Sequence, residues 1–167
     1  LQEGSMEKFK SYHKRAEERF KSYGLLPRPI NKGEVEEFIE LLKGETTEES
    51  IEFLGKKYIL GELLARIVKN EVLRGTFPEC YSKAEGLYKF ATGETESKYM
   101  SKEEAVDALS ELSDPRIVLP LIHALSDDSA YVRRSAADAL GRTGAIKAVK
   151  PLMKALTDDD RYVKETA

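Results

Sequence analysis

The 167-residue sequence predicts an all-α protein in which stacked antiparallel helix pairs form an α-α superhelix. Two observations lead to this prediction. Apolar residues recur every three or four positions over nearly the whole chain, which is the period of one helix face, and alternating strand patterns are nearly absent. The part after residue 100 also repeats itself every 31 residues, a length typical of helix-pair repeats.

Helices are predicted over the first 100 residues and at the start of the repeats, each marked by its apolar stripe or by a cap. Residues 1–5 are expected to be a remnant of an expression vector and are left out of the fold. Prolines should keep residues 25–30 extended. The predicted helices are residues 6–23, residues 34–43, a helix with a Thr46–Glu49 capping box that holds Ile51, Phe53 and Leu54, residues 58–73, and two helices opened by the boxes Ser82–Glu85 and Ser101–Glu104.

The choice of acidic residue predicts a domain boundary near residue 100. All 18 acidic residues before position 101 are glutamates, whereas all eight aspartates lie from Asp107 onward. Glutamate favours helix interiors and aspartate favours caps and turns. We therefore expect a helical region over residues 6–100 and Asp-capped repeats over 101–167, the last of them incomplete.

The 31-residue shift aligns three successive windows of the sequence. It places Pro120-Leu121 on Pro151-Leu152, Ala124-Leu125 on Ala155-Leu156, Asp127-Asp128 on Asp158-Asp159, Tyr131-Val132 on Tyr162-Val163, and Ala105, Asp107, Ala108 and Leu109 on Ala136, Asp138, Ala139 and Leu140. Three windows in one register are hard to obtain by chance. A unit of this size cannot bury its own apolar face, so it must stack on its neighbours.

Each unit is predicted to consist of two helices. Asp114 caps the first, with Pro115 at the first helical position, where the missing N–H has no cost. Asp127 or Asp128 caps the second, and Gly141 and Gly144 close it. The repeat assigns structural roles to Asp114, Pro115, Leu121, Leu125, Asp127, Val132, Arg133, Ala136, Leu140 and Gly141.

From its Asp-Pro start through residues 131–134 to Ala139-Leu140-Gly141, this pattern resembles the short HEAT-like repeat first associated with phycobilin lyases. The resemblance implies a HEAT-like solenoid, a fold that serves many kinds of partner. Because the sequence stops inside the second helix of a unit, we expect it to be a fragment.

A second resemblance covers residues 9–140. The series Tyr12 to Arg19, Gly24-Leu25-Leu26-Pro27-Arg28-Pro29-Ile30 and Val35 to Lys43 is similar to the amino-terminal HEAT-like domain of bacterial aconitase B, and so are residues 61–67, 101–109 and 118–125. Residues 72–99 look like an insertion against that family. The resemblance implies a domain without chemistry, which governs subunit association and access to an active site whose cluster ligands lie in other domains.

Composition excludes several classes of protein. No apolar run approaches the 18 residues of a membrane span, and one cysteine, Cys80, cannot form an intrachain disulfide or supply the thiolates of an iron–sulfur cluster. A net charge of −3 argues against non-specific binding to nucleic acid, which needs a basic stripe. We expect a cytoplasmic protein without a cofactor.

No catalytic or metal-binding group emerges from the remaining candidates. A di-iron site built from His-Glu pairs is excluded because His123 precedes Ala124 and His13 precedes Lys14. His123 is interpreted as a partly buried packing residue and Cys80 as a bystander thiol in a loop. Asp158-Asp159-Asp160 lacks the ligand spacing of an EF-hand and suits helix capping better. The tyrosines before residue 100 are expected mainly at the edge of the core, with an aromatic contact patch as the alternative.

The adjacent arginines 133 and 134 receive different interpretations. Arg133 is expected to bond loop aspartates such as Asp127 or Asp158 between stacked repeats, although an anionic partner is the alternative. Arg134 falls on Glu165 in the next window and is expected to face solvent.

Three hypotheses about function follow. The first is a non-catalytic scaffold that binds another protein or another domain of its own chain, through a ridge formed by Lys102, Glu103, Arg134, Asp138 and Glu165. The second is the amino-terminal regulatory or association domain of an aconitate hydratase B-like enzyme, whose Fe–S catalytic domains are not in this chain. The third, a HEAT solenoid that binds DNA or RNA, requires the basic residues to gather on one face.

Overall fold

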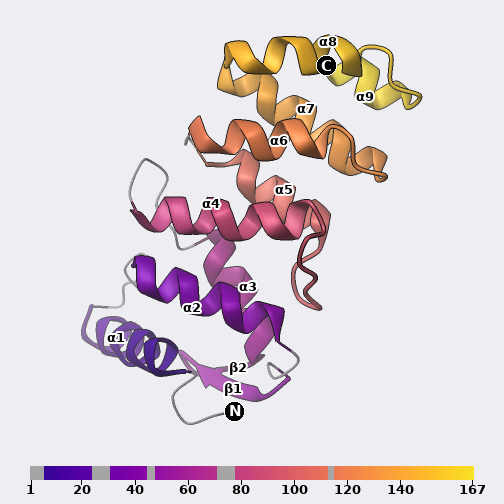
Figure 1. Ribbon diagram of the computed structural model, residues 1–167. Helices are drawn as coiled ribbons and strands as arrows, with labels where there is room; N and C mark the ends of the chain where they lie inside the picture. The colour runs from indigo at the N-terminus through magenta and orange to yellow at the C-terminus, as the bar shows by residue number, and fades with distance from the viewer. Residues whose placement is uncertain (1–5, 24–30, 45–47, 71–77, 113–114) are drawn as a thin grey trace. The chain divides into compact units, whose positions relative to one another are not determined.

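The computed structural model describes residues 6–23, 31–44, 48–70, 78–112 and 115–167. Within these residues the protein is helical apart from one small hairpin, which confirms the predicted all-α class (Figure 1). The elements are α1 Glu7–Tyr23, α2 Lys32–Lys43, β1 Ser50–Phe53, β2 Lys56–Ile59, α3 Leu60–Asn70, α4 Pro78–Ala91, α5 Lys102–Ser110, the 3₁₀ turn η2 Pro115–Ile117, α6 Val118–Ala124, α7 Ala130–Thr143, the 3₁₀ turn η3 Ile146–Ala148, α8 Val149–Ala155 and α9 Arg161–Thr166.

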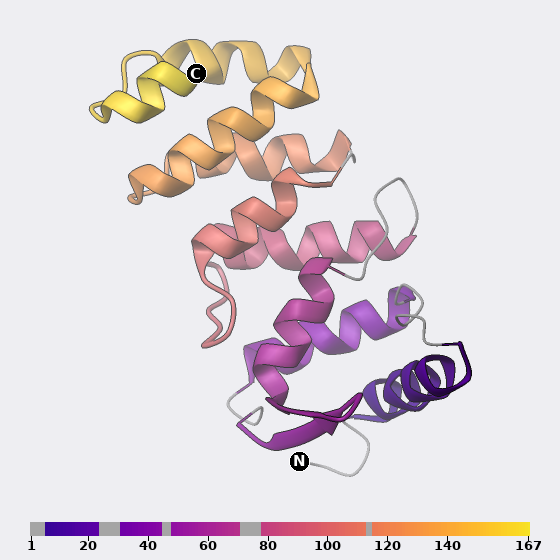
Figure 2. The ribbon, with the colours of Figure 1, turned by 180° about the vertical axis from the view of Figure 1, so that it is seen from behind.

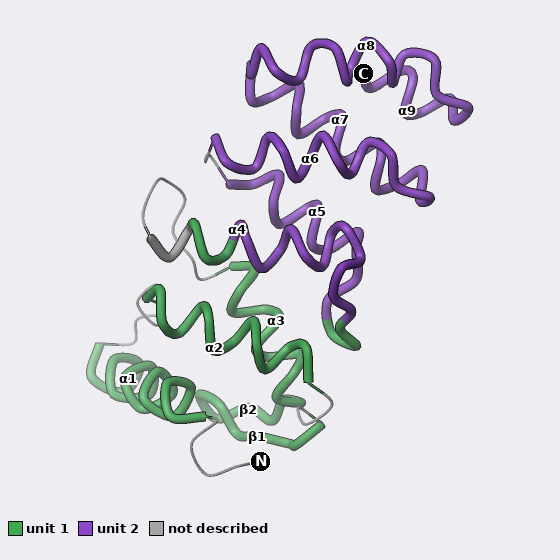
Figure 3. Tube along the Cα trace, in the orientation of Figure 1, with its two compact units in different colours: residues 1–73, 77–83, 97–99 green, residues 74–76, 84–96, 100–167 purple. Residues whose placement is uncertain are grey.

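The chain divides into two compact units (Figure 3). Unit 1 contains residues 1–73, 77–83 and 97–99, and unit 2 contains residues 74–76, 84–96 and 100–167. The superhelix predicted for the whole chain and the boundary predicted near residue 100 stay predictions.

The core of unit 1 is a cluster of aromatic rings. The Phe38 ring of α2 lies edge-on to Phe9 and Tyr12 of α1, with ring centroids 5.8 and 5.7 Å apart. The Phe53 ring of β1 stacks on Tyr12 at 6.1 Å. Offset and edge-to-face pairs of this kind are favourable beyond the area that they bury. The α1 stripe at positions 9, 12 and 16 is therefore the inner face of the helix.

The helix predicted to hold Ile51, Phe53 and Leu54 is wrong. These residues form the strand β1 and its turn, and β1 pairs with β2 in antiparallel register, Ser50 opposite Ile59. Leu54 and Gly55 have φ angles of +51° and +74°, which a helix does not allow but a tight hairpin turn requires. The helix predicted from residue 58 accordingly starts later, at α3. Thr46 of the supposed capping box lies outside the described residues.

Unit 2 is built from two layers of helices. In the views of Figures 1 and 2, α6 and α8 lie on one side, and α5, α7 and α9 succeed one another on the other. The inner face of α7 consists of small residues and Leu140, which let α5 and α9 approach closely. The buried residues of α5 and α7 are Ala105, Val106, Ala108, Leu109, Val132, Ala136, Ala137, Ala139 and Leu140.

Some of the predicted helix ends are confirmed and others are wrong. Ser101 and Glu104 form the predicted capping box of α5, and Gly144 ends α7 with a left-handed φ of +61°. Gly141 does not close the helix, because it lies inside α7. Ser82 does not open a helix either, because α4 begins at Pro78. The first helix of the repeat begins as the 3₁₀ turn η2, and Asp114 lies outside the described residues.

No helix in the described ranges is both long enough and apolar enough to cross a membrane.

Candidate functional site

The charged residues of the repeats form a ladder inside unit 2. Lys102 Nζ lies 3.1 Å from Asp127 Oδ2, between the start of α5 and the turn before α7. One repeat further on, Arg133 Nε and Nη2 donate to the two carboxylate oxygens of Asp158 at 2.9 and 3.0 Å. Both basic residues precede their aspartates by 25 positions, and the two pairs are related by the 31-residue shift. The repeat in the sequence is therefore a repeat of ion pairs.

The Arg133 guanidinium connects two successive turns. Its Nη1 also donates to the backbone carbonyls of Asp127 and Asp128, at 2.8 and 3.0 Å. This is the role that the sequence suggested for Arg133. The hydrogen bond to Asp158 raises the pKa of Arg133, and the same bond lowers the pKa of Asp158. Likewise, the bond to Asp127 raises the pKa of Lys102.

The aspartates of the turns order the backbone before each second helix. Oδ1 of Asp127 accepts from the N–H of Ser129, and Oδ1 of Asp158 accepts from the N–H of Asp160, each at 2.9 Å. Ser129 is the N-cap residue of α7, so the prediction that Asp127 or Asp128 takes that position is wrong. Asp160 caps α9 by accepting from Tyr162 N and Val163 N. Asp158 and Asp160 of the acidic run are thus used by the fold.

Two members of the predicted ridge are engaged in this packing. Lys102 takes part in the ladder, and a carboxylate oxygen of Glu103 accepts from Ser129 Oγ at 3.1 Å. Both side chains connect α5 to the turn before α7. They are less available to a partner than the sequence suggested.

The other three members are exposed. Arg134 and Asp138 lie on the outer face of α7, and Glu165 lies on α9. Asp138 pairs with Arg142 at 3.0 Å and Glu165 pairs with Arg161 at 2.7 Å, both within their own helices. Exposed pairs of this kind contribute little to stability, so the side chains can exchange partners at low cost.

Tyrosines complete this surface, and the sequence-based ridge did not include them. Tyr131 and Tyr162 occupy equivalent repeat positions and are 50% and 61% exposed. The Tyr131 hydroxyl donates to Asp107 Oδ2 at 2.8 Å, which raises the pKa of the phenol, and the Arg134 guanidinium lies 5.8 Å from the Tyr162 ring centre. The repetition of Tyr-Val in the sequence was the signal for these positions. We call the set Asp107, Tyr131, Arg134, Asp138, Tyr162 and Glu165 the second-helix ridge.

The histidine of the repeats is not the partly buried residue that was predicted. His123 is exposed on α6, and its ring lies edge-on to Tyr88 with centroids 6.3 Å apart. The described residues contain no group of three His, Cys, Asp or Glu side chains arranged to hold a metal ion. Cys80 lies in the first turn of α4 rather than in a loop.

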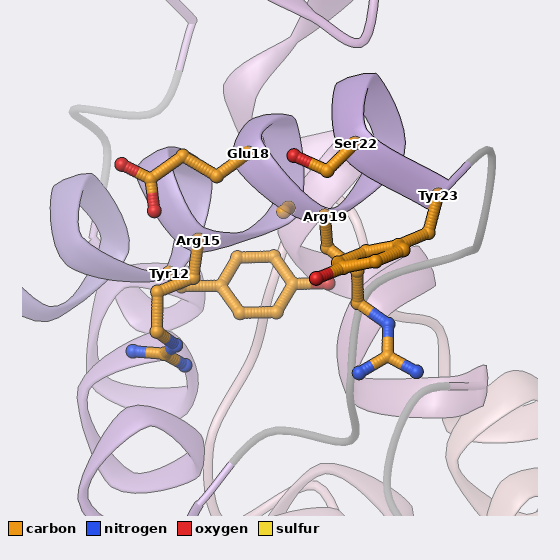
Figure 4. A pocket seen from close by; sticks show the side chains of 7 residues that line it. Tyr12, Arg15, Glu18, Arg19, Ser22 and Tyr23 are labelled. Carbon is orange, nitrogen blue, oxygen red and sulfur yellow. The ribbon is translucent and has the colours of Figure 1, made fainter.

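A cavity of about 410 Å³ lies beside α1 (Figure 4). Its described lining comes from this one helix and includes Arg15, Arg19, Ser22 and Tyr23. Arg15 is already used, because its Nη2 lies 2.6 Å from a carboxylate oxygen of Glu34, whose side chain is only 3% exposed. The described lining of the cavity contains no convergent set of reacting groups.

The tyrosines of the first part do not form one patch. Tyr12 is buried in the aromatic core of unit 1, whereas Tyr23 is 75% exposed beside the α1 cavity. Tyr58 lies under the Arg66 guanidinium, 4.9 Å from the ring centre. Of these three tyrosines only the half-buried Tyr58 fits the predicted place at the edge of the core.

Comparison with known proteins identifies related sequences. The family model of the aconitate B N-terminal domain matches residues 11–166. Aconitate hydratase B of Escherichia coli strain K12 is 30% identical over 116 residues, and aconitate hydratase B of Salmonella typhimurium strain LT2 is 31% identical over the same length. These matches cover 70% of this chain but only 12% of each relative.

An iron–sulfur cluster, which the sequence resemblance placed in other domains of that enzyme, does not fit the donor set of this chain. Protein-bound clusters are held mainly by cysteine thiolates, and the chain has only Cys80. No reaction step through a cluster can be assigned to these residues.

Proposed function

Since the chain belongs to the family of aconitate hydratase B amino-terminal domains, we propose that it is the association domain of a longer, aconitase B-like protein. The observation that carries the proposal is the match of the family model over residues 11–166. It favours this reading over a general-purpose scaffold. The longer protein would supply the hydratase chemistry, and this domain would control how its parts associate.

The donor chemistry of the chain agrees with a role in association. A hydratase of this kind needs residues that hold a cluster and residues that move a proton at the substrate. One cysteine and a histidine exposed at α6 do not make such a site. What the domain offers instead is an exposed surface of mixed polarity.

The second-helix ridge is the part of this surface best suited to another protein. Tyrosine and arginine are enriched at protein interfaces, because they combine a large contact area with hydrogen-bonding groups. Tyr131, Arg134 and Tyr162 bring such groups to one face of α7 and α9. The three acidic residues of the ridge outnumber its single arginine, so a nucleic-acid backbone is a poorer match.

The proposal is tested by separating the domain from the rest of the protein. The longer protein, prepared without residues 1–167, should bind the isolated chain when the two are mixed, as measured by titration calorimetry. The substitution Arg134→Glu should weaken binding, whereas Lys14→Glu, at an exposed position of α1, serves as a matched charge reversal outside the ridge. Aconitate turnover by the isolated chain would overturn the proposal, and so would unchanged binding by the Arg134 variant.

A further inference from the structure

One row of apolar residues is exposed on α8, although its repeat counterparts are covered. Val149, Met153 and Leu156 are 52%, 63% and 53% exposed and follow one another at helical spacing. Their counterparts in the preceding helix pair, 31 residues earlier, are a valine only 7% exposed and two half-buried residues: Val118, Ile122 and Leu125.

The contrast does not extend to every position of the two helices. Leu119 of α6 is 65% exposed, and its counterpart on α8 is the charged residue Lys150, which is also exposed. The outer face therefore remains outside in both helix pairs. Val149, Met153 and Leu156 are open where their counterparts are covered, and Leu152 is half-buried where its counterpart Leu121 is fully buried. The added exposure is therefore specific to the apolar positions of α8.

The cation of the last helix pair is also exposed. Lys102 and Arg133 each bind the aspartate 25 residues further on, and the 31-residue shift places Lys164 third in this series. The Lys164 side chain is exposed on α9 and makes no hydrogen bond or ion pair within the described part of the chain, although its charge helps to lower the pKa of Asp158 in its own helix pair. By the 31-residue shift, the apolar row and Lys164 occupy the positions that Val118, Ile122, Leu125 and Arg133 hold in the preceding helix pair.

We propose that the face formed by Val149, Met153, Leu156 and Lys164 docks a further helix pair of the same repeat pattern. This inference rests on the proposed function, since we assign the helix pair to the longer protein proposed there; the matched part of this chain spans only 12% of each relative's length.

The ladder also specifies the sequence of the occupant. In both observed turns one aspartate oxygen accepts from the N–H two residues later, while the carboxylate also binds the preceding repeat's cation. Each of these aspartates lies three residues before the first residue of the second helix. The partner turn should therefore carry an aspartate three residues before its second helix, with its carboxylate on Lys164 Nζ.

The accessibility of Met153 provides the direct test. Hydrogen peroxide converts exposed methionine to its sulfoxide, and the buried Met100, which is 3% exposed, serves as the internal reference. In the isolated chain Met153 should oxidise much faster than Met100, as followed by peptide mass spectrometry. In the longer protein Met153 should be slowed to the rate of Met100, and Lys164→Met should restore part of the fast oxidation. Equal rates for Met153 in both proteins would overturn the proposal.

A second experiment uses only the sequence of this chain. A copy of residues 137–167 joined after Ala167 continues the register and brings a copy of Asp158 to Lys164. Met153 should become protected, and Lys164→Met should destabilise the extended chain while leaving the original chain unchanged. An extension that folds but leaves Met153 as reactive as before contradicts the docking. If the longer protein has hydratase activity but its Met153 oxidises as fast as in the isolated chain, the docking proposal is rejected and the proposed function is not affected.

Discussion

Replacement of Arg133 by methionine should cost this protein about 2–3 kcal/mol of unfolding free energy, because it removes the cation that connects two repeat turns. The side chains of Arg133 and Asp158 are only 17% and 13% exposed, and the guanidinium makes four hydrogen bonds. Exposed ion pairs contribute about 0–1 kcal/mol, whereas loss of one partner of a buried pair costs about 3–5 kcal/mol. A largely covered pair such as Arg133–Asp158 falls between these limits.

Urea unfolding followed by circular dichroism measures this cost. With about 1–3 kcal/mol per molar of urea for a small protein, the midpoint should fall by roughly 0.7–3 M. The matched control is Arg134→Met, one position further along the same helix. Arginine and methionine have similar helix propensities, and an exposed cation–π contact is worth about 0.5 kcal/mol, so the control should change little.

A double-mutant cycle with Asp158→Asn separates the ion pair from the backbone contacts. The coupling free energy between Arg133 and Asp158 should be about 1–2 kcal/mol, while the remainder reflects the bonds to the carbonyls of Asp127 and Asp128. If the Arg133 variant lost no more stability than the Arg134 variant, the ladder would not stabilise the stacking of the repeats, and the reasoning would be refuted.

Three further predictions follow from individual contacts. The hydrogen bond from Arg133 lowers the pKa of Asp158 below its ordinary value of 3.8. The stabilisation by this ion pair is therefore complete above pH 3.8 and is lost as the pH falls through the lower pKa of the folded protein. The unfolding free energy of Asp158→Asn should accordingly change less with acid pH than that of the parent protein. Gly141→Ala should raise the unfolding free energy by about 0.5–1 kcal/mol, since nothing lies within 4 Å of the added Cβ in this helix. Gly144→Ala should lower it by about 1 kcal/mol, because a φ of +61° is strained for alanine. Thermal unfolding in which both variants shift in the same direction would contradict this. Glu34→Ala should lower the unfolding free energy measured in urea by about 2 kcal/mol, because the buried carboxylate accepts from Arg15 at 2.6 Å and from Asn31 N at 2.9 Å. A loss below about 0.5 kcal/mol would show that water replaces the carboxylate as acceptor.

The helices with regular apolar stripes could be predicted from the sequence, because a 3–4 spacing has few other interpretations. The hairpin could not. Its apolar residues Ile51, Phe53 and Leu54 fit a short helix as well as a strand, and the choice depends on two left-handed residues in the turn and on the burial of Phe53 against Tyr12. Both are properties of the folded chain.

The candidate surface was predicted in part for a related reason. Helical spacing indicated that Lys102, Glu103, Arg134, Asp138 and Glu165 share the outer side of the second helices. It did not show that the first two reach the neighbouring turn. A long side chain can either face solvent or extend along the surface to a partner, and the backbone period is the same in both cases.

The sequence by itself determined the helical class, the 31-residue register and the absence of a thiolate set for a cluster, because each of these depends on residue type and spacing along the chain. The tertiary structure decided which of the repeated charges hold the repeats together and which are exposed. Arg133 and its neighbour Arg134 are chemically identical, and only the position of the next repeat's turn places a carboxylate beside the first and an exposed tyrosine ring beside the second.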